Sequence, residues 1–223
     1  PLGRTTRVIL RAGMPGEDGL RVNQDQVLNI AMPDRAPRLA FDPGHYLMPR
    51  DRAEARVPMA LMNISAIEMR VIRLTERSLI PFSRETRLGE AISGWTAGYL
   101  HEEWGQVVWE GAIELPRGEA NRFQRLSVPL PEAVRTAGPG LYIMVARPAD
   151  GARDSRGLTA AQPLIVTDLG LTAWRGAGGL AAQVRGLASA APREGVRVAL
   201  MARNNDILAE ATTGPAGLAR FHA

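Results

Sequence analysis

Residues 106–115, with the sequence QVVWEGAIEL, decide the fold class because apolar and polar side chains alternate along them with a period of two. One face carries Val107, Trp109, Gly111, Ile113 and Leu115, and the other carries Val108, Glu110, Ala112 and Glu114. This pattern is typical of a half-buried strand in an antiparallel sheet. It predicts that Trp109 lies in the core. The next stretch, 122–130, follows a turn at 116–118 and is predicted to be the hairpin partner of this strand.

The same alternation recurs along the chain and predicts an all-β protein. The other predicted strands are 4–11, 24–32, 38–42, 55–64, 140–147, 163–167, 180–187, 196–202, 207–212 and 218–221. Turn-forming residues separate several of them, including Asn204-Asn205-Asp206 and the segment 214–217 (GPAG). In the last third, Val196, Val198 and Leu200 are predicted to face inward.

Residues 65–82 are ambiguous, because Ile67, Met69 and Val71 alternate but Ile72 and Leu74 then fall in the opposite phase. A helix with Ile67, Val71 and Leu74 on one face is an alternative. We favour a strand to about residue 75 followed by a helical turn, since Pro81 and the β-branched residues disfavour a long helix.

The composition describes an ordinary globular protein. The chain has 223 residues, of which 45% are hydrophobic and 22% are charged, so it can bury a core and is not disordered throughout. It has no cysteine, which excludes disulfides, thiolate metal sites and an internal thioester within these residues. No apolar run reaches the ~18 residues of a membrane span, so we expect no direct membrane insertion.

The net charge of +4 does not indicate a nucleic-acid partner. All 27 basic residues are arginine, and they are scattered rather than gathered into a tract. No nucleic-acid-binding motif accompanies them. We therefore expect solvated faces and local ion pairs, and no nucleic acid among the partners.

No complete catalytic or metal-binding motif is present, so we predict that the chain is not an enzyme and holds no cofactor or metal. His45, His101 and His222 lack the spacing of metal ligands. No Gly-x-Ser-x-Gly elbow exists, and the Gly-rich stretch 176–179 is predicted to be a hairpin loop rather than a phosphate site.

An aromatic cluster supplies the candidate interface residues, which are Trp95, Tyr99 and Trp104. Large aromatic side chains usually bury most of their area, so we expect packing over the end of a sandwich or against a neighbouring domain. The alternative is an exposed stacking platform, which would make the protein a carbohydrate- or cell-surface-binding β-sandwich.

Three blocks are predicted. Residues 1–35 are a leading β segment, interpreted as the end of a preceding domain, and they finish in the linker-like stretch 33–37 (PDRAP). Residues 36–167 are a β-sandwich, and residues 168–223 are a second sandwich with few strands. Strands at both ends suggest a piece of a longer protein.

Several segments resemble domains of bacterial alpha-2-macroglobulins. Residues 166–175 (VTDLGLTAWR) resemble the family's "SDLGLT" segment, and 196–209 (VRVALMARNNDILA) resemble its "V-x-V-x-L-x-ARNN-x-x-LA" hairpin. Residues 79–82 (LIPF) and 108–111 (VWEG) match "LVPF" and "VWEG". The resemblance spans roughly residues 38–223. At residues 213–217 (TGPAG), the aspartate of the family's "TDADG" turn is missing.

The resemblance implies tandem antiparallel β-sandwich domains of macroglobulin or fibronectin-III-like type. It further implies a structural role in a broad-spectrum peptidase inhibitor that traps target proteases in the bacterial periplasm as an inner-membrane lipoprotein. The family's bait region and Cys-x-x-Gln thioester are absent from these residues. The expected partners are therefore target proteases, through the full-length protein, and neighbouring domains of the same chain.

Overall fold

The computed structural model describes residues 2–17, 19–44, 47–49, 55–87, 90–92, 105–149 and 157–221. Its elements, in chain order, are β1 (Arg4–Leu10), β2 (Gln26–Met32), β3 (Arg38–Phe41), β4 (Leu47–Met48), β5 (Arg56–Met62), β6 (Ala66–Leu74), η1 (Glu76–Ser78), α1 (Leu79–Glu85), β7 (Gly105–Glu114), β8 (Gln124–Pro129), α3 (Glu132–Ala137), β9 (Gly140–Pro148), β10 (Ala160–Val166), β11 (Leu169–Gly176), β12 (Gly179–Gly186), β13 (Arg197–Met201), β14 (Ile207–Thr212) and β15 (Leu218–Phe221). The predicted all-β class is confirmed. No helix in these ranges is long and apolar enough to cross a bilayer.

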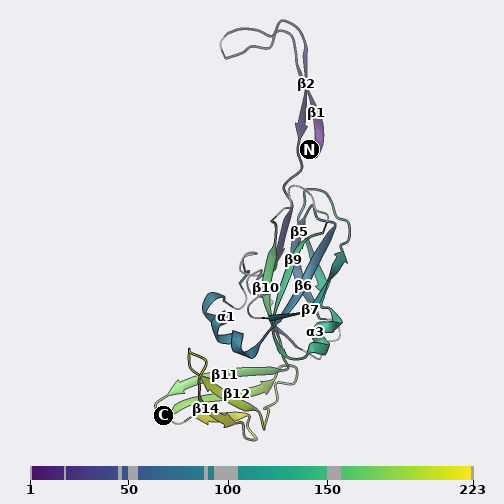
Figure 1. Cartoon of the computed structure of the whole chain (residues 1–223). Helices are drawn as coiled ribbons and strands as arrows, with labels where there is room; N and C mark the ends of the chain where they lie inside the picture. Colours follow the sequence, from purple (N-terminus) through teal and green to yellow (C-terminus); the bar gives the residue numbers. More distant parts are fainter. Residues whose placement is uncertain are drawn as a thin grey trace.

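The chain is elongated, and three parts follow one another along it (Figure 1). The β1–β2 hairpin extends away from one end of a central sandwich, and β11–β15 lie beyond the other end. Short connections join the parts, since β3 begins six residues after β2 and β11 begins three residues after β10. The central sandwich is therefore the body to which both other parts attach.

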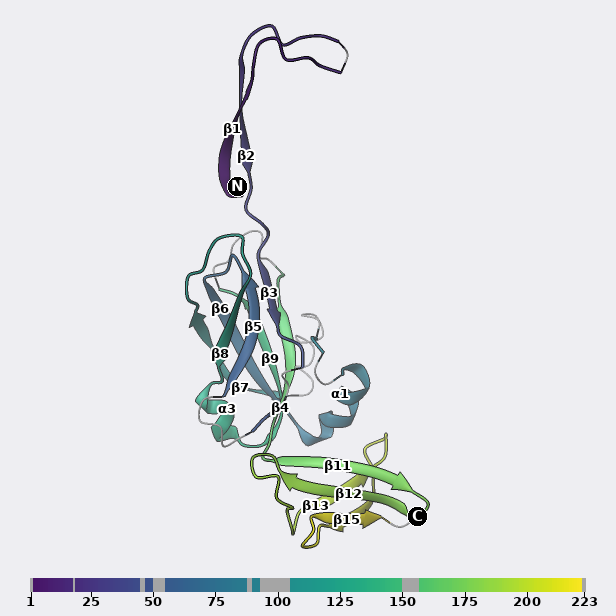
Figure 2. The same cartoon turned by 180° about the vertical axis from the view of Figure 1, so that it is seen from behind.

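Two sheets face one another in the sandwich (Figure 2). One has the strand order β4-β10-β9-β6-β7 and the other has the order β3-β5-β8. The pairs are antiparallel except for the short pair of β4 with β10, which is parallel. The side chains between the sheets form the main core, and its fully buried members include Met59, Leu61, Ile67 and Leu164.

The ambiguous segment 65–82 forms the central strand β6 followed by η1 and α1, as favoured from its sequence. Both faces of β6 are covered. Val71 faces the main core, whereas Ile72 and Leu74 pack in a second cluster with Phe82 of α1. The apolar residues in both phases thus reflect a strand buried on both sides, which period-two alternation alone does not distinguish from a helix.

The predicted hairpin of 106–115 with 122–130 is wrong. β7 pairs with β6, and β8 pairs with β5 in the opposite sheet, so the connection between β7 and β8 crosses from one sheet to the other. Alternation predicts which face of a strand is buried, but it does not identify the neighbouring strand.

A register shift opposite Val71 and Ile72 also alters the predicted inward face of β7. Val71 pairs with Trp109 and Ile72 pairs with Val107, so Val108 is the extra residue of a bulge. Val107 is consequently exposed, and Val108 packs against the core instead. Trp109 and Ile113 are partly buried against the main core, and the Trp109 ring lies over Gly111, where an added Cβ would be 2.8 Å from it.

Helix α3 and the residue after it were not predicted from the sequence. Pro131 precedes the helix, and Gly138 ends it with φ of 88°. The phenol of Tyr142, which is fully buried on β9, then donates a hydrogen bond back to the carbonyl oxygen of Gly138. This bond ties the helix and its turn to the sandwich core, in the manner of a tyrosine corner.

The C-terminal part contains a three-stranded sheet, β11-β12-β15, and a two-stranded sheet, β13-β14. Strands β11 and β12 form a hairpin with Gly176 opposite Gly179, which confirms the predicted loop at 176–179. Asn205 has φ of 76° in the turn between β13 and β14, as predicted for that asparagine-rich segment. Val196, Val198 and Leu200 share the less exposed phase of their strand.

The N-terminal hairpin is an isolated two-stranded sheet in register from Arg4 opposite Met32 to Leu10 opposite Gln26. One face gathers Val8, Leu10, Leu28, Ile30 and Met32, and every residue of β2 is exposed. Two-stranded hairpins are marginal on their own in water. Additional contacts, at its distal end and at its base, therefore matter for its stability.

At the distal end, Asp25 joins the two arms of this hairpin. Its carboxylate accepts a hydrogen bond from the backbone N–H of Ala12 at 2.9 Å and another from the Arg11 guanidinium. The Ala12 N–H and, secondly, Arg11 lower the pKa of Asp25 below its ordinary value of 3.8. Both interactions favour the charged carboxylate.

We expect an NMR titration of the Asp25 carboxyl carbon to have a midpoint below 3.8. Because the folded pKa is lower than the unfolded one, the stabilisation is present above the unfolded pKa and is lost as the pH falls through the folded value. Arg11→Ala should raise the midpoint without restoring 3.8, since the Ala12 N–H remains. A midpoint at or above 3.8 in the parent protein would contradict this assignment.

Candidate functional site: the two junctions of the sandwich

The N-terminal junction is built from two turns at the end of the sandwich nearest the hairpin. Asn63 lies between β5 and β6, and Asn121 lies in the connection from β7 to β8. Both have left-handed backbone conformations, with φ of 55° and 66°. Asparagine is among the few residues other than glycine that adopt this conformation readily, so these turns position two amide side chains beside the linker 33–37.

The two asparagines bind one another reciprocally. The backbone N–H of Asn121 donates to Oδ1 of Asn63 at 2.7 Å, and Nδ2 of Asn63 donates to Oδ1 of Asn121 at 3.2 Å. Residues 58 positions apart in sequence are thereby joined at the tip of the sandwich. The same two amides also bind the linker.

The linker is held through Arg35 and Asp34. Nδ2 of Asn63 donates to the carbonyl oxygen of Arg35 at 2.7 Å, and the backbone N–H of Arg35 donates to Oδ1 of Asn121 at 2.6 Å. Nδ2 of Asn121 donates to Oδ1 of Asp34 at 2.7 Å. We call Asp34, Arg35, Asn63 and Asn121 the junction cluster.

The C-terminal junction lies beside α1. Strand β10 ends at Val166 and β11 begins at Leu169, so Thr167 and Asp168 form the whole connection. The N–H of Thr167 donates to the carbonyl oxygen of Met48, which attaches the start of this connection to β4. From α1, the Arg84 guanidinium donates to the carbonyl oxygen of Arg203 in the turn between β13 and β14. This contact joins the sandwich to the C-terminal part.

An apolar groove of about 640 Å³ lies next to this junction, between α1 and the ends of β9 and β10. Its lining includes Leu79, Phe82, Leu141, Ile165 and Val166. Thr167 of the connection also lines it. The groove therefore belongs to the sandwich and lies next to the start of the C-terminal part.

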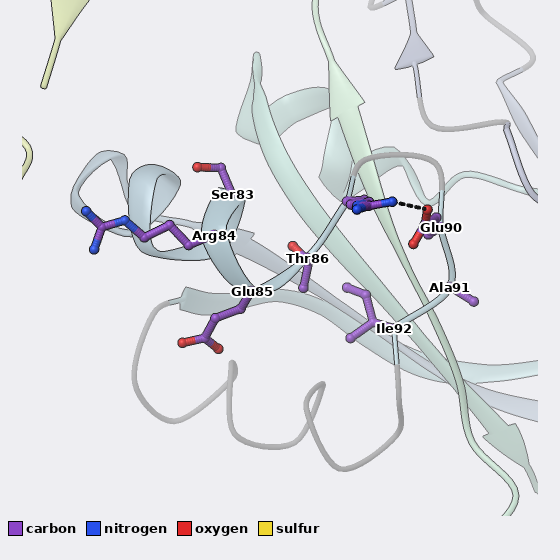
Figure 3. Close-up of a pocket in the computed structure, with 8 residues that line it drawn as sticks. Ser83, Arg84, Glu85, Thr86, Glu90, Ala91 and Ile92 are labelled. Atoms are coloured by element: carbon purple, nitrogen blue, oxygen red, sulfur yellow. Dashed lines mark ion pairs between the residues drawn. The ribbon is translucent and has the colours of Figure 1, made fainter. Parts of the chain in front are cut away.

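A second, more polar depression of about 330 Å³ adjoins the end of α1 (Figure 3). Arg84 and Glu85 extend in different directions, and Thr86 and Ile92 lie between them and the ion pair of Arg87 with Glu90, whose charged atoms are 3.7 Å apart. These polar groups do not converge on a common point, whereas acid–base or nucleophilic catalysis requires converging groups. The depression consequently does not supply the geometry of an active site.

The candidate interface residues Trp95, Tyr99 and Trp104 lie outside the described residues, so their packing and the carbohydrate-binding alternative stay predictions. The three histidines also lie outside the described ranges.

Glu110 forms an ion pair with Arg70, directly across from it on β6, and their charged atoms are 2.7 Å apart. Within the described ranges, no group of three or more potential metal ligands is found.

Sequence reasoning missed the junction cluster and Arg84. Only Asn121 carried a weak local signal, because it stands between two predicted strands, whereas Asn63 lies inside the predicted strand 55–64. Their pairing over 58 residues and the contact of Arg84 with a turn 119 residues later have no local sequence signature.

The fold and the junctions together define a chain of tandem β-sandwich domains. Residues 41–159 match the family model of the bacterial alpha-2-macroglobulin MG2 domain, and residues 166–223 match that of the MG3 domain. The first match alone covers more than half of the chain. The chain belongs to the bacterial alpha-2-macroglobulin family. No curated protein matched the chain.

Solved structures of the family share the fold. A crystal structure of native Escherichia coli alpha-2-macroglobulin spanning domains MG0-NIE-MG1 is 20% identical, with a TM-score of 0.64, and the match covers 100% of this chain and 69% of that one. The native conformation determined by cryo-EM is 21% identical with a TM-score of 0.66 over 100% of this chain. The trypsin-activated E. coli protein is 21% identical with a TM-score of 0.64, over 83% of this chain and 12% of that chain. This chain spans 14% of the length of the cryo-EM relative.

Proposed function

We propose that this chain is a structural scaffold within a bacterial alpha-2-macroglobulin-like, broad-spectrum peptidase inhibitor that traps proteases in the periplasm. The observation that carries the proposal is the consecutive match of residues 41–159 and 166–223 to two domains of that family. The thioester would lie elsewhere in the full-length protein, because the present residues contain no cysteine, and the bait region would lie outside these residues as well. The chain would thus act without a catalytic site of its own.

The scaffold role is supported by how the sandwich is built. Its main core is closed by side chains from both sheets, and a second cluster seals α1 against the outer face of β6. Close-packed interiors transmit displacement with little deformation. In the proposed inhibitor, such a body would convert cleavage of a distant bait segment into movement of whole domains around the protease.

The block 1–35 fits the same proposal as the end of a preceding domain. The apolar face of its hairpin, formed by Val8, Leu10, Leu28, Ile30 and Met32, is the kind of surface that a second sheet covers in a sandwich. Its neighbours in the full-length protein would then be domains of the same chain. We also propose attachment to the inner membrane as a lipoprotein, by a part of the protein outside these residues.

The inhibitor proposal is tested with the full-length protein that contains these residues and with trypsin, the protease that activated the E. coli relative. Trypsin should lose its action on a large protein substrate but keep its action on a small chromogenic peptide, because a trapped protease is shielded sterically and its active site stays intact. The 223-residue chain alone should not inhibit trypsin. Full activity on the large substrate after preincubation with the full-length protein, or inhibition by the chain alone, would overturn the scaffold proposal.

Cell fractionation tests the location separately. The full-length protein should be absent from the cytoplasmic fraction and should need detergent for release from the inner membrane. Recovery in the cytoplasm would contradict the periplasmic proposal while leaving the family membership unchanged.

A further inference from the structure

We propose that the junction cluster (Asp34, Arg35, Asn63 and Asn121) fixes the N-terminal hairpin to the sandwich, so that the two move as one rigid body. This inference concerns a conformational property of the chain and does not depend on the proposed function. It rests on how completely the cluster restrains the linker between β2 and β3.

The linker 33–37 has the sequence PDRAP, with a proline at each end. Proline fixes its own φ near −65°, so the rotations at Pro33 and Pro37 are already restricted. The residues between the prolines are the ones that would otherwise swivel. Two of them, Asp34 and Arg35, are those that the asparagines bind.

The asparagines hold the linker from two separate turns of the sandwich. Asn63 binds the carbonyl oxygen of Arg35, and Asn121 binds its N–H, so both backbone polar groups of Arg35 are engaged. Because the two amides also bind one another, neither can rotate to follow a moving linker without breaking the reciprocal pair. Three hydrogen bonds to the linker therefore oppose a change in the direction of the hairpin, and two more between the asparagines hold the amides in place.

Asp34 also lies beside the first arm of the hairpin. Gly3, just before β1, has φ of 71°, and its N–H donates to the carbonyl oxygen of Met32 at 2.8 Å. A Cβ added to Gly3 would lie 2.2 Å from Oδ1 of Asp34, which shows how closely this carboxylate approaches the backbone of the first arm. The same Oδ1 accepts the amide of Asn121. The first arm is thus bonded to the second at the base of the hairpin, beside the carboxylate that Asn121 binds.

The test is a distance measurement by double electron–electron resonance between spin labels on the hairpin and the sandwich. The chain has no cysteine, so Thr5→Cys and Ser127→Cys, both at exposed positions, give two unique labelling sites. The parent chain should give one narrow distance distribution. Asn63→Gly and Asn121→Gly remove the side chains but keep a residue that tolerates the left-handed backbone.

We expect each glycine variant to broaden the distribution by roughly 5–10 Å, the spread that a freed linker of this length allows. Asn205→Gly, at a left-handed asparagine in the distant turn between β13 and β14, should leave the width unchanged. Asp34→Ala, at an exposed position whose loss should not prevent folding, should give an intermediate broadening. Unchanged widths in the Asn121→Gly and Asp34→Ala variants, with circular dichroism showing folded chains, would overturn the proposal.

Discussion

Replacing Tyr142 with alanine should lower the free energy of unfolding of the sandwich by about 3–5 kcal/mol. Tyr142 is the largest of the fully buried side chains in the described part of the chain, with no exposed surface, and it lies in the main core on β9. Its removal leaves a cavity between two sheets that are fixed by their own hydrogen-bonded neighbours, so the site has little freedom to collapse. Urea unfolding followed by tryptophan fluorescence measures the loss.

Tyr142→Phe separates the hydroxyl from the ring. This variant should lose about 1–3 kcal/mol, because the buried carbonyl oxygen of Gly138 loses the hydrogen bond from the phenol. Val107→Ala, at an exposed position on β7, is the matched control and should change the free energy of unfolding by less than about 0.5 kcal/mol. A phenylalanine variant as stable as the parent would show that the bond to Gly138 contributes nothing.

The sequence predicts the strands well because burial in a sandwich imposes a period of two on each of them. It does not predict which strands are neighbours. β7 and β8 are consecutive and have matching alternation, yet they lie in different sheets, since their pairing depends on β6 and β5, which come much earlier in the chain. The bulge opposite Val71 and Ile72 arises from the same pairing, and it is why Val107 is exposed and Val108 packs inward.

The junctions are less predictable than the strands for a related reason. Asn63 falls at the end of a predicted strand and Asn121 looks like an ordinary turn residue, and only the packing of the two sheets brings their amides together beside Arg35. In the sequence, Arg84 likewise looks like any exposed helical arginine. Its role follows only from the fold, which places the turn containing Arg203 next to it. Hydrogen bonds between turns leave no periodic pattern, whereas buried faces do. The candidate interface residues Trp95, Tyr99 and Trp104 stay a prediction, as they lie outside the described residues.

Gly217→Ala should destabilise the C-terminal sheets by about 2–4 kcal/mol, since two penalties act together. Gly217 has φ of 70°, which disfavours any residue with a Cβ, and an added Cβ would lie 2.4 Å from the carbonyl oxygen of Val184. The backbone cannot easily move apart there, because the N–H of Val184 donates to the carbonyl oxygen of Gly217 at 2.8 Å.

Hydrogen exchange of the Val184 amide measures this effect directly, because that amide exchanges only when its bond to Gly217 opens. Gly195→Ala is the matched control for the conformational penalty alone: Gly195 has φ of 75°, but nothing lies within 4 Å of the position of an added Cβ. It should cost about 1–2 kcal/mol. If both variants lost the same free energy, the added Cβ at position 217 would be accommodated beside β12 at no energetic cost. The left-handed backbone alone would then explain the glycine at this position.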